Sequence, residues 1–229
     1  MNLSDVDVAV ERSQYQAARS TITIKKDLSL YLFVKRTVDI VLSLLGIIFL
    51  IPVFIIVSIM IKVEDRNGPV FFKQLRVGKD GKQFYMFKFR SMVSNAEELL
   101  AALLEKNEVS GAMFKMKNDP RITKIGRFIR KTSIDELPQL WNVLKGEMSL
   151  VGPRPPLPRE VAEYTNYDKQ RLLVTPGCTG LWQVSGRSNI GFEEMVELDL
   201  EYITNRSVKN DFKIIVKTFM VLLGSKDAY

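Results

Sequence analysis

The longest apolar run in the chain extends from residue 40 to residue 61, and its 22 residues include no charged side chain. The run is apolar on every face of a helix, which suits lipid better than the one-sided stripe of a helix packed on a soluble core. Pro52 lies just past the middle of the run, where it removes a backbone hydrogen bond and predicts a kink. Each half would be about 16 Å long and reach roughly half the hydrocarbon depth. The pattern predicts a re-entrant membrane helix over residues 31–62, broken near Pro52, that enters and leaves on one membrane face.

Basic residues flank this run equally, so the positive-inside rule selects no crossing direction. A single helix that spans the bilayer is therefore the competing interpretation. Asp39, just before the run, is expected to pair with Lys35 or Arg36 at the interface. The flanking cations are Lys25, Lys26, Lys35 and Arg36 before the run, and Lys62, Arg66, Lys73 and Arg76 after it.

The polar pattern divides the rest of the chain into an arm and a globular part. Residues 1–30 are polar without a sustained period, and they lack the basic start, short apolar core and cleavage site of a signal peptide. Residues 63–229 alternate apolar and polar positions in short segments, as expected for a cytosolic catalytic domain. We therefore expect an N-terminal arm, a membrane helix and one folded domain.

Two apolar strands joined by a glycine turn predict a β-hairpin in the domain. The strands are expected over residues 69–77 and 82–90, with the turn at residues 78–81. Lys88 and Arg90 flank Phe89, so the strand period of two places both cations on one face. This face is either a solvated edge or a cationic wall for phosphates or lipid headgroups.

Helical periods dominate the remaining segments. The C-terminal helix is amphipathic and predicts either an interfacial helix or a helix packed on the protein's own core. The expected fold class is α+β: a re-entrant membrane helix hairpin, and a compact, mainly helical cytosolic domain with a small β-hairpin and interfacial amphipathic helices. The expected helices cover residues 95–106, 159–173, 193–202 and 212–223.

Composition narrows the chemistry that this chain can perform. The net charge of +7 favours anionic partners, including phosphorylated substrates and anionic membrane lipids. The chain has no histidine, which excludes Ser-His and Cys-His nucleophiles and histidine zinc sites. Its one cysteine, Cys178, allows no internal disulfide. No nucleic-acid-binding motif is present, and aromatic residues are not interleaved with the basic runs, so no nucleic-acid partner is expected.

Residues 132–156 concentrate the side chains that phosphate chemistry needs. Two adjacent carboxylates, Asp135 and Glu136, precede Arg154, which lies between Pro153 and Pro155. Acids hold a divalent metal or attack phosphorus, and an arginine binds phosphate oxygens as a bidentate fork. The alternative is structural, because Ser133 as an N-cap and Glu136 three residues later match a capping box. A basic segment over residues 122–131 leads directly into the acids and favours the phosphate interpretation.

A second candidate segment is glycine-rich and ends in a basic turn. Glycines at positions 177, 180 and 186 let backbone amides approach a ligand closely, and Arg187 follows the last of them. The segment matches neither the P-loop nor the dinucleotide fingerprint.

Three long motifs, FKFRSM, DPRITKIGRFIRKTSIDELPQLWNVLKGEMSLVGPRP and TPGCTGLWQVSGRS, resemble bacterial monotopic phosphoglycosyl transferases, the polyprenyl-phosphate hexose-1-phosphate transferases. The resemblance covers about residues 32–223. Within the family, the chain is similar to the small core form. It implies transfer of a sugar-1-phosphate from a UDP-sugar, galactose or glucose, to undecaprenyl phosphate with release of UMP. This is the initiating step of exopolysaccharide, capsule or glycan synthesis, on the cytoplasmic face of the cytoplasmic membrane. A homodimer is compatible with the family. One departure is Ile51, where studied relatives carry serine before the proline.

The resemblance also implies roles for individual residues. Asp135 would be the nucleophile, and would also contact the Mg²⁺ cofactor that the family needs, and Glu136 would be its partner. Lys88, Arg90, Arg154 and Arg187 would bind substrate. Two routes stay open, because either Asp135 or the lipid phosphate can attack the donor first. Glu136 could position the incoming phosphate or accept a proton. The rival hypothesis is a non-catalytic, membrane-seated basic module in polysaccharide assembly.

Overall fold

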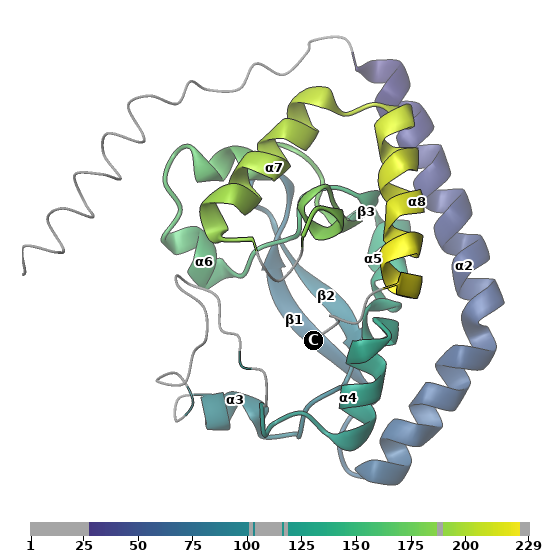
Figure 1. Cartoon of the computed structure of the whole chain (residues 1–229). Helices are drawn as coiled ribbons and strands as arrows, with labels where there is room; N and C mark the ends of the chain where they lie inside the picture. Colours follow the sequence, from purple (N-terminus) through teal and green to yellow (C-terminus); the bar gives the residue numbers. More distant parts are fainter. Residues whose placement is uncertain (1–27, 101–102, 104–115, 117–118, 187–189, 225–229) are drawn as a thin grey trace, which may run out of the picture.

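The computed structural model describes residues 28–100, 103, 116, 119–186 and 190–224. These residues form a mixed fold of helices with two small two-stranded sheets, alongside one long apolar helix near the N-terminus (Figure 1). The expected arm of residues 1–30 lies almost entirely outside the described residues.

The expected β-hairpin is confirmed. β1 (Phe71–Val77) and β2 (Gln83–Phe89) pair antiparallel, from Phe71 opposite Phe89 to Val77 opposite Gln83. The turn between the strands needs left-handed backbone at Asp80 and Gly81, whose φ angles are 55° and 78°. Glycine adopts this conformation without steric cost, which explains the Asp-Gly sequence at the turn.

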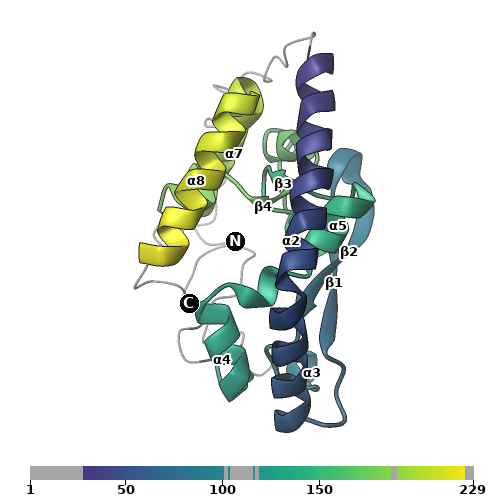
Figure 2. The same cartoon turned by 90° about the vertical axis from the view of Figure 1, so that its right-hand side faces the viewer.

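The apolar run lies in one continuous helix, α2 (Ser29–Glu64), rather than in the expected hairpin of two half-helices. Pro52 lies inside α2, and the helix is continuous through it. Figure 1 shows that α2 is bent and curves around one side of the domain. Figure 2 shows α2 extending along the length of the domain. A proline costs a single intrahelical bond, and flanking turns of strongly apolar residues keep the helix intact around it.

One face of α2 packs on the domain at both ends of the helix. Near the N-terminus Lys35 donates to the Val151 carbonyl at 2.9 Å, and near the C-terminus Val57 and Ile61 bury against Phe89 and Ile129. The opposite face is apolar and largely exposed: Phe33, Phe49 and Val63 are 71%, 83% and 75% exposed. The described part of the chain thus leaves a long apolar surface uncovered.

The polar residues at the start of α2 have different partners from those expected. Lys35 pairs with Asp211 at 2.8 Å, and Asp39 accepts a hydrogen bond from the Leu150 backbone at 2.9 Å. Arg36 donates to the carbonyls of Val143 and Leu144 at 2.6 and 2.8 Å. These bonds replace the interfacial pair predicted within the helix itself.

The rest of the domain is built from short elements around a small core. β3 (Ser149–Val151) and β4 (Gly177–Thr179) form a parallel pair that the sequence pattern did not indicate. Val151 joins Val196, Leu200, Ile203 and Ile214 in the main core cluster. The helices are α3 (Ala96–Leu100), α4 (Lys124–Lys131), α5 (Gln139–Lys145), α6 (Pro158–Ala162), α7 (Phe192–Asn205) and α8 (Val208–Gly224).

One helix prediction needs correction, and another lies mostly outside the described residues. The segment expected as one helix over residues 159–173 forms the short α6 and a separate 3₁₀ turn over Asp168–Leu173. Of the helix expected over residues 95–106, the structure describes α3 and residue 103. The helices expected over residues 193–202 and 212–223 are confirmed as α7 and α8.

Candidate functional site

The Asp135-Glu136 pair lies in a tight turn between α4 and α5. α4 begins at the N-cap Thr123, whose hydroxyl accepts from the Gly126 amide at 2.8 Å. After α4 ends, Ser133 adopts left-handed backbone with a φ of 55°, and the 3₁₀ turn Ile134–Glu136 follows. The expected capping box at Ser133 is wrong, because its side chain makes no capping hydrogen bond. A non-glycine residue in this conformation costs about 1–3 kcal/mol and is common at functional sites.

Glu136 is held by two cations from distant parts of the chain. Lys88, near the end of β2, approaches Glu136 Oε1 with its Nζ at 2.6 Å. Arg154 approaches the same oxygen with its Nη1 at 3.7 Å. The structure therefore brings together three of the predicted site residues, Lys88, Glu136 and Arg154. Lys88 is 48 positions before Glu136 in the sequence, and Arg154 is 18 positions after it.

Asp135 differs from its neighbour in having no such partner. Its side chain is buried, and within the described segments no group donates a hydrogen bond to it or pairs with it. Burial raises the pKa of Asp135 to about 6, and the charge of Glu136 adds to the rise while Lys88 opposes it. At neutral pH the carboxylate is therefore mostly ionised, although it is buried and has no hydrogen-bond partner among the described residues.

The pKa of Glu136 moves in the opposite direction. Burial favours its neutral form, but Lys88 and Arg154 outweigh burial and lower the pKa to about 2. The two adjacent carboxyl groups therefore differ in protonation behaviour: Asp135 takes up a proton near pH 6, whereas Glu136 stays charged at neutral pH.

Arg154 is presented by a segment whose backbone is fixed on both sides. Arg76 donates to the Pro155 carbonyl at 2.9 Å, and the Val77 amide donates to the Pro156 carbonyl at 2.9 Å. The Gly177 amide donates to the Pro153 carbonyl at 2.8 Å. The Arg154 side chain remains 36% exposed, so its guanidinium can reach a ligand from a rigid backbone.

Arg76 is a site residue that the sequence reasoning missed. It is buried, and desolvation together with Arg154 lowers its pKa to about 9, while Glu160 and Glu136 oppose the fall. In the sequence it reads as one of several cations flanking the apolar run, and only its position on β1 beside β2 brings it near Glu136. Arg130, at the end of α4, adds positive charge near Asp135 in the same way.

One predicted substrate-binding residue, Arg90, is not in this cluster. The Arg90 guanidinium is held by Asp65 at 3.0 Å and by the Ser94 hydroxyl at 3.1 Å, so it fixes the connection after α2. The period of two placed Lys88 and Arg90 on one face, but the two side chains engage different acids. Arg187 lies outside the described residues.

The acid composition of the site bears on metal binding. Within the described parts of the chain, no group of three or more acidic or cysteine side chains converges to hold a metal alone. Mg²⁺ is usually held by one or two carboxylates together with substrate phosphates. A single carboxylate without a protein partner, Asp135, fits that mode of binding.

Comparisons with known proteins identify the family and relatives of the chain. The family model described as "Bacterial sugar transferase" matches residues 30–225. The chain is 47% identical over 227 residues to galactosyl transferase CpsE of Streptococcus agalactiae serotype III (strain NEM316), which covers 97% of this chain and 50% of that protein. It is 48% identical over 201 residues to undecaprenyl-phosphate galactose phosphotransferase of Salmonella typhimurium (86% of this chain, 42% of that protein). It is 38% identical over 207 residues to UDP-glucose:undecaprenyl-phosphate glucose-1-phosphate transferase of Xanthomonas campestris pv. campestris (87% and 40%).

The chain spans about half or less of the length of these three relatives. The family match, by contrast, covers nearly the whole chain, including α2, the hairpin and the Asp135 turn. The chain therefore belongs to the bacterial sugar transferase family.

Proposed function

We propose that this chain transfers a sugar-1-phosphate from a UDP-sugar to undecaprenyl phosphate and releases UMP, as the initiating step of exopolysaccharide or capsule synthesis. The observation that carries the proposal is the contrast within the acid pair. Asp135 is buried, ionised and unengaged, and the adjacent Glu136 is fixed by Lys88 and Arg154. Related proteins are named for both galactose and glucose, so the proposed sugar is one of these two.

The proposed reaction has two displacements at the same phosphorus. An Asp135 carboxylate oxygen attacks the β-phosphorus of the UDP-sugar, and the bond from that phosphorus to the bridging oxygen breaks. UMP leaves with the bridging oxygen, and an aspartyl sugar-phosphate remains. A phosphate oxygen of undecaprenyl phosphate then attacks the same phosphorus and releases the Asp135 carboxylate. Neither step requires a proton, since attacking and leaving groups are both anions.

Both displacements bring negative charge onto negative charge, which the protein's cations offset. Arg154 and Lys88 lie beside the acids, and Arg76 and Arg130 add to the positive field. Preorganised charge of this kind acts on the developing oxyanions without further reorganisation. Glu136 keeps its charge at neutral pH, so its proposed role is to hold Lys88 and Arg154 in place rather than to accept a proton.

Asp135 is also the residue that we propose would hold Mg²⁺. The metal would neutralise the diphosphate when bound. The unengaged carboxylate of Asp135 supports this assignment, since Lys88 already occupies Glu136.

The proposed location is the cytoplasmic membrane, with the domain on the cytoplasmic face. α2 packs on the same domain at both ends, through Lys35 near its start and Ile61 near its end. A helix that crossed the bilayer could not have the polar domain beside both ends, so we propose that both ends stay on one side. The proposal retains the expectation that both ends of the helix lie on one membrane face, but with a continuous helix in place of two half-helices.

The exposed apolar faces of α2 and α8 support contact with lipid. Figure 2 shows both helices on the side of the molecule that faces the viewer. On α8, Phe212, Phe219 and Met220 are 66%, 62% and 58% exposed, and Lys213 and Lys217 are exposed between them. Lysine beside exposed aromatic residues suits a membrane interface with anionic lipids. A homodimer remains a prediction.

The test is UMP release by the purified chain in detergent with UDP-galactose or UDP-glucose and undecaprenyl phosphate. We expect release with one of these donors, and a denaturation-stable sugar-phosphate adduct on the protein when the acceptor is left out. Asp135→Asn should abolish both signals. UMP release at the wild-type rate by this variant would exclude Asp135 as the nucleophile. No release with any UDP-sugar would favour the non-catalytic module instead.

A further inference from the structure

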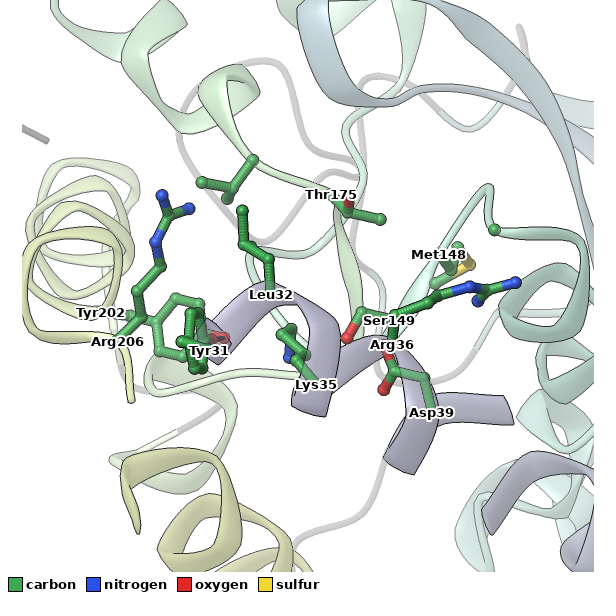
Figure 3. Close-up of a pocket in the computed structure, with 12 residues that line it drawn as sticks. Tyr31, Leu32, Lys35, Arg36, Asp39, Met148, Ser149, Thr175, Tyr202 and Arg206 are labelled. Atoms are coloured by element: carbon green, nitrogen blue, oxygen red, sulfur yellow. Dashed lines mark hydrogen bonds between the residues drawn. The ribbon is translucent and has the colours of Figure 1, made fainter. Parts of the chain in front are cut away.

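A cavity of about 130 Å³ lies between the start of α2, β3 and the junction of α7 and α8 (Figure 3). Tyr31, Lys35 and Asp39 line it from α2, Ser149 from β3, and Arg206 from the α7–α8 junction. None of Lys88, Asp135, Glu136 and Arg154 lines this cavity, so it is separate from the proposed reaction site.

Most of the charged groups at this cavity already have protein partners. Lys35 is bonded to Asp211 and to the Val151 carbonyl, and Arg36 to the Val143 and Leu144 carbonyls. Asp211 also accepts from the hydroxyls of Tyr31 and Tyr202, at 3.0 and 2.9 Å. The acids near the cavity are therefore committed to groups other than Arg206.

Arg206 is the exception among the described lining residues. Its Nε atom is buried and has no hydrogen-bond partner in the described structure, and no carboxylate pairs with its guanidinium there. A buried donor without an acceptor destabilises the folded state, and more so when the group is charged. An anionic acceptor in the cavity would remove this cost. In Figure 3 the Arg206 guanidinium and the Thr175 side chain lie on either side of Leu32.

The surroundings of the cavity mouth are apolar. Leu30, Leu32 and Phe33, at the start of α2, are 75%, 48% and 71% exposed. The charge-free run begins at residue 40, about two to three turns farther along the helix. A cationic cavity at this position lies at the depth of phospholipid headgroups when α2 rests in the membrane.

We propose that this cavity binds a phosphate group, with Arg206 as its main ligand. The phosphate belongs either to a membrane phospholipid headgroup, whose chains would lie along Leu32 and Phe33, or to a soluble phosphate. The lipid source depends on the membrane placement proposed above, whereas phosphate binding itself does not depend on transferase activity.

The experiment is calorimetric titration of the full chain, delipidated in a non-ionic detergent, with dihexanoyl phosphatidylglycerol and separately with inorganic phosphate. We expect saturable binding of at least one probe. Arg206→Gln should weaken it by roughly tenfold or more, the effect of losing a hydrogen bond to a charged group. Lys209→Gln is the matched control, because Lys209 is exposed on α8 and does not line the cavity. It should change the Kd less than about twofold, as expected of an exposed charge.

A second variant keeps the test decisive if Arg206→Gln unfolds. Leu32→Trp narrows the mouth from an exposed position and leaves every cation in place. It should also weaken binding. Tighter binding of the short-chain lipid than of phosphate assigns the headgroup source, and equal binding assigns a soluble phosphate. Absence of saturable binding to both probes, or wild-type binding by the folded variants, would overturn the proposal. UMP release by the same samples reports separately on the proposed reaction.

Discussion

Lys88 Nζ lies 2.6 Å from Glu136 Oε1, which joins the end of β2 to the turn before α5. Burial lowers the pKa of Lys88, and Glu136 opposes this fall. The ion pair places one positive charge beside both acids of the turn, because Lys88 also acts on Asp135. The Lys88–Glu136 ion pair therefore holds a cation from β2 close to Asp135, the proposed nucleophile.

Removing this cation should impair the chemistry rather than the fold. Lys88→Met is expected to lower kcat/KM by roughly 100-fold or more, the range found when a preorganised charge is removed from a reacting centre. UMP release by the folded variant is the measurement. Arg90→Met is the matched control, since Arg90 pairs with Asp65. It should lose thermal stability and keep kcat within a few-fold of wild type. Equal loss of kcat in both folded variants would contradict the assignment.

The first half-reaction should lose rate as pH falls through about 6. Burial raises the pKa of Asp135 to about 6, so the carboxyl is protonated below this pH and cannot attack phosphorus. The UMP burst without acceptor isolates this step from titration of the lipid phosphate. We expect a tenfold fall in the burst rate per pH unit well below 6, and a flat profile from about 7 to 8.

The acidic limb of the pH–rate profile should move when the charge of Glu136 is removed. Glu136 raises the pKa of Asp135, so Glu136→Gln should shift the limb to lower pH. Glu136 has a pKa of about 2 and adds no limb of its own in the range measured. A limb that stays at the wild-type position or moves upward in this variant would assign the titration to a group other than Asp135.

Arg36 is expected to position the catalytic segment from the apolar helix. It donates to the carbonyls of Val143 and Leu144 near the end of α5, and α5 begins three residues after Glu136. Arg36→Met should lower kcat by about tenfold with little change in KM, because a displaced α5 misaligns the turn that precedes it. Arg36→Lys should restore part of kcat by bonding one of the two carbonyls.

Lys62→Met is the control for this variant, since Lys62 lies at the other end of α2 and donates to the nearby Arg66 carbonyl, with no other partner among the described residues. Its kcat should match that of wild type. A rise in KM with unchanged kcat in Arg36→Met would indicate a binding role for Arg36 instead.

Gly126 should tolerate no side chain. A Cβ there would lie 1.9 Å from the Ser91 carbonyl oxygen, so Gly126→Ala must push α4 away from the end of β2. We expect a loss of about 3 kcal/mol, or roughly 10 °C in melting temperature. Gly191→Ala, where no atom lies within 4 Å of the added Cβ, should shift it by a few degrees at most. Similar melting temperatures for both variants would show that α4 packs differently.

The sequence determined the local features of this protein. The charge-free run predicts a membrane-facing helix because its composition requires an apolar environment on most faces. The β-hairpin follows from two apolar strands around a glycine turn. Asp135, Glu136 and Arg154 could be selected because they lie within one short segment with paired acids and prolines.

The tertiary structure decided which charges meet. Lys88 and Arg90 are equivalent by strand period, yet the fold pairs Lys88 with Glu136 and Arg90 with Asp65. Arg76 reaches the site only because β1 pairs with β2, where its guanidinium donates to the Pro155 carbonyl. The continuity of α2 through Pro52 also depends on packing at both ends of the helix. Side-chain pairing and helix bending depend on contacts between residues far apart in the chain, and local sequence patterns do not encode those contacts.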